Sequence, residues 1–317
     1  MSDSTQSPTT SQDVTAQVLD TLAAAGDTRL AFVTRALVRH LHDLAREVQL
    51  SPGELFAAAE FLTACGQISS ASRHEFLLLS DTLGLTMVVD TLAATAPAGT
   101  FESSVLGPFY RAEAPFHEHG ADLSRGEIDG EPLHVAALVT DANGRALPGA
   151  VLDVWGTNAA GLYENLDPTQ PDMNLRGRFR ADDDGRVDFW TVKPVSYPIP
   201  DDGPAGALLH GLHRHNMRPG HLHVIVSADG HRTVVSELFT DDDPYLDSDA
   251  VFGVKPSLVV HYDRVTPDPT ADSSRTGPFW SLRHDFVLAA GEATRVGFST
   301  GTLDDTPDDT PDDTPDR

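Results

Sequence analysis

The chain has 317 residues, of which 40% are hydrophobic, and it carries a formal net charge of −26 at pH 7. This length suffices for one large or two modest folded domains, and the negative charge argues against binding to nucleic acid or to an anionic membrane surface. The sequence has no apolar run of eighteen residues, no secretory signal pattern and only one cysteine, Cys65, so we expect a cytoplasmic protein without a membrane span or an intramolecular disulfide.

Residues 1–12 are rich in serine and threonine, and we expect them to be disordered. Helical periodicity begins after them and continues to about residue 100. Val33, Leu37, Leu41 and Leu44 recur at three- or four-residue steps, which predicts an amphipathic helix.

Two capping boxes predict further helix starts. Ser51 and Glu54 precede the run Leu55–Cys65, with proline at the first helical position. Ser72 and Glu75 precede the stretch Phe76–Leu92. That stretch is apolar nearly all round, which predicts a helix buried inside the domain or at a subunit contact.

From about Leu133 the apolar period changes to two, which predicts β-strands separated by Asp-Gly and Asn-Gly turns. Many short strands of this kind favour an antiparallel sandwich or barrel. The predicted strands are Leu133–Val139, Val151–Trp155, Arg176–Ala181, Val187–Val192, His221–Ser227, Thr233–Phe239, Ser257–Tyr262 and Phe279–Leu288.

Two segments lack strand periodicity. Lys193–Pro219 carries five prolines and predicts a long loop, and long loops inside compact domains are often functional. Residues 301–317 contain Asp-Asp-Thr-Pro three times over, which predicts a disordered acidic tail without a catalytic role.

His221 and His223 are two residues apart in a predicted strand, so both imidazoles project from one face and can bind one metal ion. Leu222, Val224 and Val226 alternate with them and predict a core on the other face. A histidine pair suits zinc, copper and iron alike.

The five tyrosines are candidates for further ligands. Tyr163 follows a predicted strand, and Tyr197 lies in the proline-rich segment. A tyrosine is ordinarily protonated up to a pKa of about 10, so binding as phenolate requires a highly charged cation such as iron(III). For either tyrosine alone, packing with a hydrogen-bonded hydroxyl is favoured over metal binding, and spacing does not select these two tyrosines as ligands.

Several segments, in one order along the chain, resemble the intradiol ring-cleavage dioxygenases, and most closely their hydroxyquinol 1,2-dioxygenase branch. The resemblance runs from Glu102 to about Asp263, and the helical part before it also fits. The segments are Ser104–Tyr110, Pro148–Trp155, Gly161–Tyr163, Arg176–Arg178, Ser196–Pro200, Arg218–His223 and Asp243–Phe252.

The resemblance implies an α+β fold, with a helical dimerisation domain at residues 13–100 and an antiparallel β-sandwich catalytic domain at 101–300. It implies one Fe(III) per subunit and cleavage of hydroxyquinol (benzene-1,2,4-triol) by O2. The product would be 3-hydroxy-cis,cis-muconate, or maleylacetate. A homodimer through the N-terminal helices, with a phospholipid at that contact, is implied as well.

The resemblance also implies roles for individual residues. Tyr163 and His221 would be equatorial iron ligands, Tyr197 and His223 axial ones, and Tyr197 would leave the iron when the diol binds. Arg218 would stabilise charge on the diolate. Asp81 matches a pocket position of the family, and we hypothesise that its carboxylate accepts a hydrogen bond from a third ring hydroxyl; the alternative is that Asp81 caps or hydrates the helix surface. The substrate pocket would comprise Leu78, Asp81, Val105, Leu106, Gly107, Pro108, Phe109, Ile199, Pro200, Arg218 and Glu237.

Two positions depart from the family pattern. Gly220 stands where relatives usually have alanine, and Glu237 stands where they commonly have glutamine. A carboxylate at position 237 would repel an anionic substrate unless it is protonated or paired.

Other functions remain open. Catechol or chlorocatechol is an alternative substrate, giving cis,cis-muconate from catechol. His221, His223 and Glu237 could instead form a two-histidine, one-carboxylate iron(II) site. The run Leu147–Trp155 also resembles non-catalytic sandwich modules.

Overall fold

The computed structural model describes residues 10–70, 73–93, 97–126, 130–267 and 277–293. Contacts divide the described residues into two compact units, with the division between Phe61 and Leu62. The predicted disordered tail, residues 301–317, lies outside the described residues.

The first unit is helical. It contains α1 (Ser11–Thr21), a 3₁₀ turn η1 (Leu22–Ala25), α2 (Arg29–Glu47) and the first part of α3 (Pro52–Ile68). Helix α1 begins two residues before the predicted start, because Thr10 and Asp13 form a capping box that the sequence analysis missed. Residues 11 and 12 are therefore helical, and the prediction of disorder there is wrong.

The predicted capping box before α3 is confirmed: the Glu54 carboxylate accepts from the Ser51 backbone N–H at 2.8 Å, and the Ser51 hydroxyl accepts from the Glu54 N–H at 3.3 Å. The second predicted box includes Ser72, which lies outside the described residues. The apolar stretch after it forms two helices, α4 (Glu75–Thr82) and α5 (Leu85–Ala93), where one was predicted. Gly84 between them has φ 74°, a left-handed conformation that ends α4 and that glycine adopts without strain.

The apolar surface of these helices is only partly covered. Leu78 is buried, but Leu83, Val88 and Leu92 are each more than half exposed in the single chain. The prediction that this stretch is buried inside the domain is therefore wrong for Leu83, Val88 and Leu92. Among the described residues no single helix is long and apolar enough to cross a membrane, whereas α4 and α5 taken together pass by length and composition with a bend of 79° between them.

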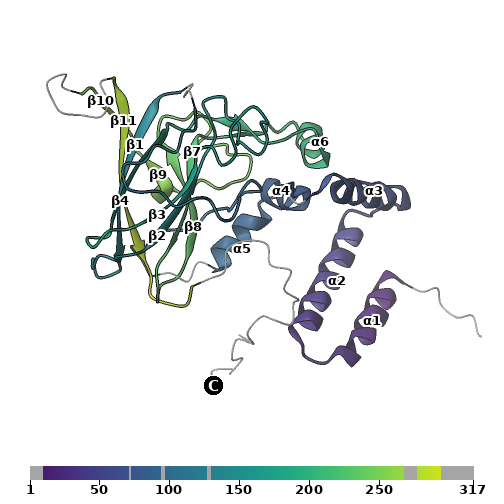
Figure 1. Ribbon diagram of the computed structural model, residues 1–317. Helices are drawn as coiled ribbons and strands as arrows, with labels where there is room; N and C mark the ends of the chain where they lie inside the picture. Colours follow the sequence, from purple (N-terminus) through teal and green to yellow (C-terminus); the bar gives the residue numbers. More distant parts are fainter. Residues whose placement is uncertain (1–9, 71–72, 94–96, 127–129, 268–276, 294–317) are drawn as a thin grey trace, which may run out of the picture. The chain divides into compact units, whose positions relative to one another are not determined.

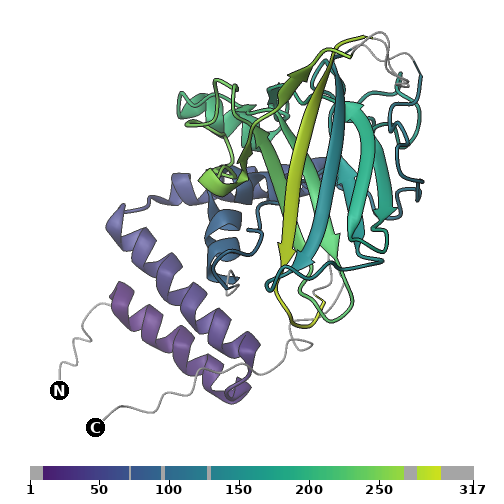
Figure 2. The same ribbon diagram turned by 90° about the vertical axis from the view of Figure 1, so that its left-hand side faces the viewer.

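The second unit is built on two packed sheets (Figures 1 and 2). The four-stranded sheet has the order β10-β11-β1-β4, and the five-stranded sheet has the order β3-β2-β7-β8-β9. Their strands are β1 (Pro132–Asp141), β2 (Val151–Trp155), β3 (Arg176–Arg180), β4 (Arg186–Val192), β7 (His221–Ser227), β8 (Val234–Thr240), β9 (Val259–Val260), β10 (Asp263–Val265) and β11 (Phe279–Leu288).

The sandwich is mixed and not purely antiparallel as predicted. β1 runs parallel to β11, and β8 runs parallel to β9. These pairs join segments far apart in the chain, so no hairpin turn forces them to be antiparallel. The predicted strand Ser257–Tyr262 is shorter than expected, because Pro256–Leu258 form a 3₁₀ turn (η2) and only Val259 and Val260 pair.

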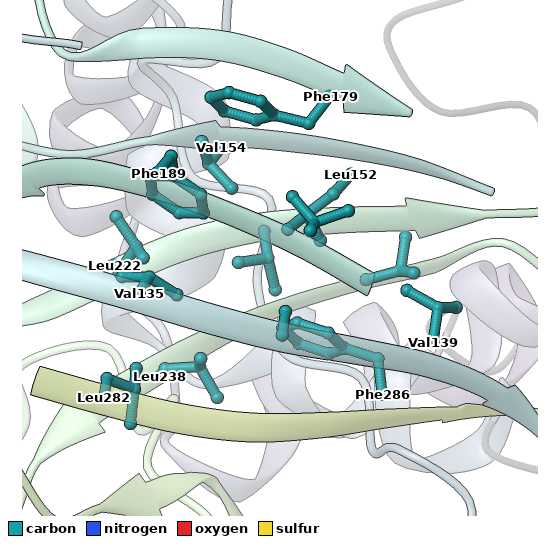
Figure 3. Close-up of a cluster of buried hydrophobic side chains, with 14 of the residues drawn as sticks. Val135, Val139, Leu152, Val154, Phe179, Phe189, Leu222, Leu238, Leu282 and Phe286 are labelled. Atoms are coloured by element: carbon teal, nitrogen blue, oxygen red, sulfur yellow. The ribbon is translucent and has the colours of Figure 1, made fainter. Parts of the chain in front are cut away.

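The core lies between the two sheets, where strands of both contribute interleaved side chains (Figure 3). Leu152 and Val154 of β2 and Leu222 of β7 meet Val135 of β1 and Phe286 of β11. The other face of the five-stranded sheet is turned toward α4, α5 and α6 (Pro204–Gly211) (Figure 1).

The proline-rich segment is more ordered than the predicted loop. It contains α6, which starts at Pro204, and two short strands, β5 (Tyr197–Pro198) and β6 (Met217–Arg218), which pair with each other. Proline at the first helical turn loses no hydrogen bond, which is why this proline begins a helix.

Candidate functional site

Strand β7 presents both histidines on the face opposite the sandwich core. Leu222, Val224 and Val226 enter the core, as predicted, while His221 and His223 project the other way and are almost fully buried. The Nδ1 atom of His221 lies 2.7 Å from the Pro219 carbonyl oxygen, to which it donates. Its Nε2 therefore carries the lone pair and faces the site.

Tyr163 reaches the histidines from the turn after β2. Gly161 adopts φ 76° in this turn, and a Cβ there would lie 2.6 Å from the Tyr197 Cβ. Glycine thus lets the two tyrosine-bearing segments approach closely.

Tyr197 is positioned by the pairing of β5 with β6, in which it lies opposite Arg218. The pairing closes the proline-rich segment at its ends and brings a residue from its beginning next to one from its end. Sequence spacing alone contains no sign of this pairing.

Four donor atoms converge in a closed ring. Tyr163 Oη lies 2.9 Å from His223 Nε2 and 3.0 Å from Tyr197 Oη. His221 Nε2 lies 3.1 Å from His223 Nε2 and 3.4 Å from Tyr197 Oη. The four side chains come from three segments of the chain, and each is at most 4% exposed.

Burial shifts all four groups toward their neutral forms. It raises the pKa of Tyr197 to about 12, raises that of Tyr163 well above its ordinary value, and lowers the pKa of both histidines. Two phenols and two neutral imidazoles then share one small polar space, and the Nε2 lone pair of His221 is directed into it.

This donor set fits a metal ion. Ligand atoms at about 2.0–2.2 Å from one ion stand about 3 Å apart in adjacent coordination positions, which is the spacing of the ring. The His223 imidazole also stacks on the Trp155 indole at 4.7 Å and an interplanar angle of 4°, which fixes its plane. Two phenol oxygens further suit a hard trivalent cation.

Glu237, on β8 opposite His223, offers a different donor set. Its carboxylate and the two histidines present atoms within 4.8 Å of one another. However, Glu237 Oε1 accepts from Arg218 Nη1 at 2.7 Å, and Oε2 accepts from Arg218 Nη2 at 3.1 Å and lies 2.8 Å from the Ser104 hydroxyl. Both carboxylate oxygens of Glu237 thus accept hydrogen bonds from protein donors, which disfavours Glu237 as a metal ligand. The ion pair with Arg218 also accounts for the negative charge at position 237 that departs from the family pattern.

Most of the predicted pocket residues gather near the tyrosines. Leu78, Val105, Leu106, Phe109 and Ile199 belong to one apolar cluster with Tyr163 and Tyr197. A Cβ at Gly107 would lie 3.3 Å from His223 Cε1, so this glycine lies against the imidazole. Pro108 and Pro200 are half-buried and flank these residues in the chain, and their contact with substrate stays a prediction.

Asp81, on α4, is 2% exposed. Its Oδ1 accepts from the Thr86 hydroxyl at 2.5 Å, while Oδ2 has no hydrogen-bond donor among the described residues. Burial raises the pKa of Asp81 to about 6, so at pH 7 it is mostly ionised with an acceptor atom to spare.

Sequence reasoning missed Asp249 and Val251. Asp249 binds Arg218, and Val251 lies in the apolar cluster of the tyrosines. Both stand in the segment Asp243–Phe252, which carried part of the resemblance, but no residue in it was given a role.

The departure at Gly220 has a structural correlate. A Cβ there would lie 2.9 Å from backbone atoms of Pro194 and Val195. Alanine would therefore require this backbone to shift.

Comparison with known proteins gives matches along nearly the whole chain. The family model described as "Catechol dioxygenase N terminus" matches residues 27–100, and the one described as "Dioxygenase" matches residues 105–290. The chain is 45% identical over 266 residues to the hydroxyquinol 1,2-dioxygenase of Rhizobium sp. (strain MTP-10005), covering 83% of this chain and 90% of that protein. It is 43% identical over 280 residues to the 6-chlorohydroxyquinol 1,2-dioxygenase of Cupriavidus pinatubonensis, covering 87% and 96%.

Solved structures agree. Hydroxyquinol 1,2-dioxygenase from Pseudomonas putida DLL-E4 superposes with a TM-score of 0.81 at 43% identity, covering 89% of this chain and 99% of that chain. Wild-type catechol 1,2-dioxygenase of Acinetobacter radioresistens gives a TM-score of 0.82 at 28% identity, covering 92% and 98%.

Proposed function

The chain belongs to the intradiol ring-cleavage dioxygenases, and we propose that its substrate is hydroxyquinol, which it opens with O2 to 3-hydroxy-cis,cis-muconate or its tautomer maleylacetate. Membership of this family makes the protein an enzyme that cleaves an aromatic diol between its hydroxyl groups. Hydroxyquinol is favoured over catechol and chlorocatechol because relatives named for hydroxyquinol reach 45% identity. A relative named as catechol 1,2-dioxygenase has 37% identity, and the catechol and chlorocatechol enzymes of known structure have 28–29%.

Enzymes of this family use non-haem iron, and we propose that Tyr163, Tyr197, His221 and His223 hold one Fe(III) in each subunit. The observation that carries this assignment is the closed ring of their four donor atoms, with neighbours 2.9–3.4 Å apart. When bound, iron(III) supplies Lewis-acid chemistry that draws electron density out of a chelated diol.

Tyr197 would be the residue best suited to take up a proton of a bound diol. Burial raises the pKa of its phenol to about 12, so a Tyr197 oxygen that holds no cation would carry a proton at neutral pH. No separate general base is then required at that oxygen.

Other residues orient the substrate and exclude water. Leu78, Val105 and Ile199 are apolar and buried beside the tyrosines, so they favour a flat aromatic ring over solvent. Arg218 Nη1 lies 3.2 Å from His221 Nε2, so its N–H is directed at the ring of four donor atoms, where it would also reach an oxygen of a bound diol.

Asp81 is the proposed basis of substrate choice. Its spare carboxylate oxygen would accept a hydrogen bond from the third hydroxyl of hydroxyquinol. Catechol lacks that hydroxyl and would leave the buried acceptor without a donor.

We further propose that the N-terminal helices, within residues 13–100, form a homodimer. Leu37, Leu41 and Leu44 on α2 are each more than half exposed in the single chain, so this apolar face has area left to bury. A phospholipid at the contact remains part of the proposal.

Product analysis tests the reaction. The iron-loaded protein is mixed with hydroxyquinol, catechol and 4-chlorocatechol under air, and products are identified by mass spectrometry and NMR. Cleavage between the hydroxyls gives a diacid, whereas cleavage beside them gives an aldehyde. We expect the diacid, formed fastest from hydroxyquinol, and a faster reaction with catechol would overturn the substrate assignment.

A visible spectrum tests the ligands. Phenolate bound to iron(III) gives an intense red-brown absorption, whereas a site of His221, His223 and Glu237 holding iron(II) would be nearly colourless. A non-catalytic module would bind no iron. Iron found by metal analysis of the same sample would therefore exclude that alternative, and its absence would support it.

A further inference from the structure

The guanidinium of Arg218 is held on two edges by buried carboxylates. Glu237 accepts from Nη1 and Nη2 at 2.7 and 3.1 Å, and Asp249 accepts from Nε and Nη2 at 3.0 and 3.1 Å. These bonds use four of the five N–H groups of the side chain. The fifth, on Nη1, lies 3.2 Å from His221 Nε2 and points at the ring of metal-binding donors.

Asp249 is itself fixed by the loop that follows it. Its Oδ1 accepts from the Val251 N–H at 3.3 Å, and its Oδ2 accepts from the Gly253 N–H at 2.9 Å. Phe252 between them has φ 61°, a conformation that bulky residues rarely adopt and that persists only when the surroundings impose it.

Gly253, at the end of this loop, lies directly against the charged groups of Arg218 and Glu237. A Cβ at this position would lie 2.8 Å from Arg218 Nη2 and 2.9 Å from Glu237 Oε2. The Gly253 carbonyl oxygen is also 3.0 Å from the Ser104 hydroxyl, which in turn contacts Glu237. The segment Asp249–Gly253 is therefore shaped around the guanidinium.

We propose that Asp249 is a positioning residue for Arg218, which fixes the guanidinium plane so that its one remaining N–H meets the substrate oxygen at the metal. The inference rests on the proposed function, because it assumes that the donor ring binds iron and a diol. A carboxylate on one edge alone leaves the guanidinium free to rock about that edge, and a second carboxylate on the adjacent edge removes this freedom.

The arrangement has an electrostatic consequence. The formal charges of one guanidinium and two carboxylates sum to −1 beside the site, which disfavours an anionic substrate. Removing the Asp249 charge should therefore leave KM unchanged or lower it, while the loss of orientation lowers kcat. A variant that merely loosened the fold would not separate the two constants in this way.

The test compares Asp249→Asn with Asp153→Asn, both iron-loaded and normalised to iron content. Asn keeps the size of the side chain but turns an amide N–H₂ toward Arg218. Asp153 is also a buried carboxylate of the same unit, and it bonds to Tyr110 rather than to Arg218. We expect kcat for hydroxyquinol to fall about tenfold to a hundredfold in Asp249→Asn without a rise in KM, and to stay within about twofold of wild type in the control.

A second measurement needs neither iron nor substrate. Hydrogen exchange at the Arg218 Nε–H is followed by NMR in the iron-free protein, where the signal is assigned by its loss in Arg218→Lys. We expect slow exchange in wild type and in Asp153→Asn, and exchange at least about tenfold faster in Asp249→Asn. If wild-type enzyme cleaves no diol, the proposed function fails, while this measurement still decides whether Asp249 fixes the guanidinium.

Gly253→Ala provides the same test if Asp249→Asn does not fold. Its methyl group would displace the guanidinium while all charges stay in place, so kcat should fall without a decrease in KM. Two results would overturn the proposal. One is hydrogen exchange at the Arg218 Nε–H that is unchanged in the variants. The other is a variant with fast exchange whose kcat equals that of Asp153→Asn.

Discussion

Replacing Asp81 by asparagine should reduce the preference for hydroxyquinol while stabilising the folded protein. Asn keeps an oxygen for the Thr86 hydroxyl, which donates to Asp81 Oδ1 at 2.5 Å. It replaces the free Oδ2 by an amide N–H₂ group, which cannot accept a hydrogen bond from the substrate.

The size of the effect follows from burial. A hydrogen bond to a charged group contributes about 1.5–3 kcal/mol, and each 1.4 kcal/mol corresponds to about a factor of ten. Asp81 is 2% exposed, so water does not replace the missing donor when catechol binds. The ratio of kcat/KM for hydroxyquinol to that for catechol should therefore fall about tenfold to a hundredfold in Asp81→Asn.

The stability change has the opposite sign. The pKa of Asp81 is raised to about 6 from 3.8, so the folded state disfavours its charged form. The resulting destabilisation is absent below about pH 4, grows between pH 4 and pH 6, and is fully present at pH 7. Two pKa units correspond to about 3 kcal/mol, which is the upper limit of the stabilisation expected from Asn at pH 7.

Steady-state kinetics with both substrates and thermal unfolding at pH 7 and pH 4.5 measure the two effects. Asp90→Asn serves as the control, because Asp90 lies on the adjacent helix α5 and pairs with Lys255 outside the donor ring. An unchanged substrate ratio would remove Asp81 from the specificity argument. An equal gain in stability at both pH values would refute the assignment of the raised pKa.

Three further predictions follow from the site and the helices. Tyr197→Phe should bind iron almost as wild type does but turn over at least about tenfold more slowly, since the proton acceptor is lost; wild-type turnover in this variant would contradict the proposed role. Removal of iron by a chelator should lower the melting temperature and abolish the red-brown absorption, because binding to the folded state alone stabilises it; scanning calorimetry of both forms measures this, and equal melting temperatures would argue against a site built from these residues. Leu41→Asp on the exposed face of α2 should shift the protein from dimer to monomer in analytical ultracentrifugation. Asp43→Asn, at an exposed residue of the same helix, is the control, and a Leu41→Asp variant that is as dimeric as this control would exclude the face as the contact.

Local patterns predicted the parts of the site that lie within one element. The period of two in β7 is enough to put His221 and His223 on one face and Leu222 in the core. The Ser51 capping box similarly predicted the start of α3. Such features depend on residues within four positions of each other, so the sequence displays them directly.

Features that depend on distant pairing were not predictable in this way. Tyr197 reaches the histidines because β5 pairs with β6 about twenty residues later, and nothing near Tyr197 indicates that pairing. The parallel pairing of β1 with β11 also has no local sign. Gly84 was missed for another reason, because a single glycine in an apolar helical run is usually tolerated, and only its φ of 74° shows a break.

Pairing explains which buried carboxylate is available to the substrate. Burial raises the pKa of Asp249, but the charge of Arg218 and its hydrogen bonds lower it by more, so the net shift is downward. The same guanidinium occupies both oxygens of Glu237. Asp81 accepts a hydrogen bond only from a neutral hydroxyl, and its pKa is raised. A substrate hydroxyl contributes most where the protein itself leaves an acceptor unsatisfied, so the third hydroxyl of the ring should be recognised at Asp81, although Glu237 was the carboxylate that looked anomalous in the sequence.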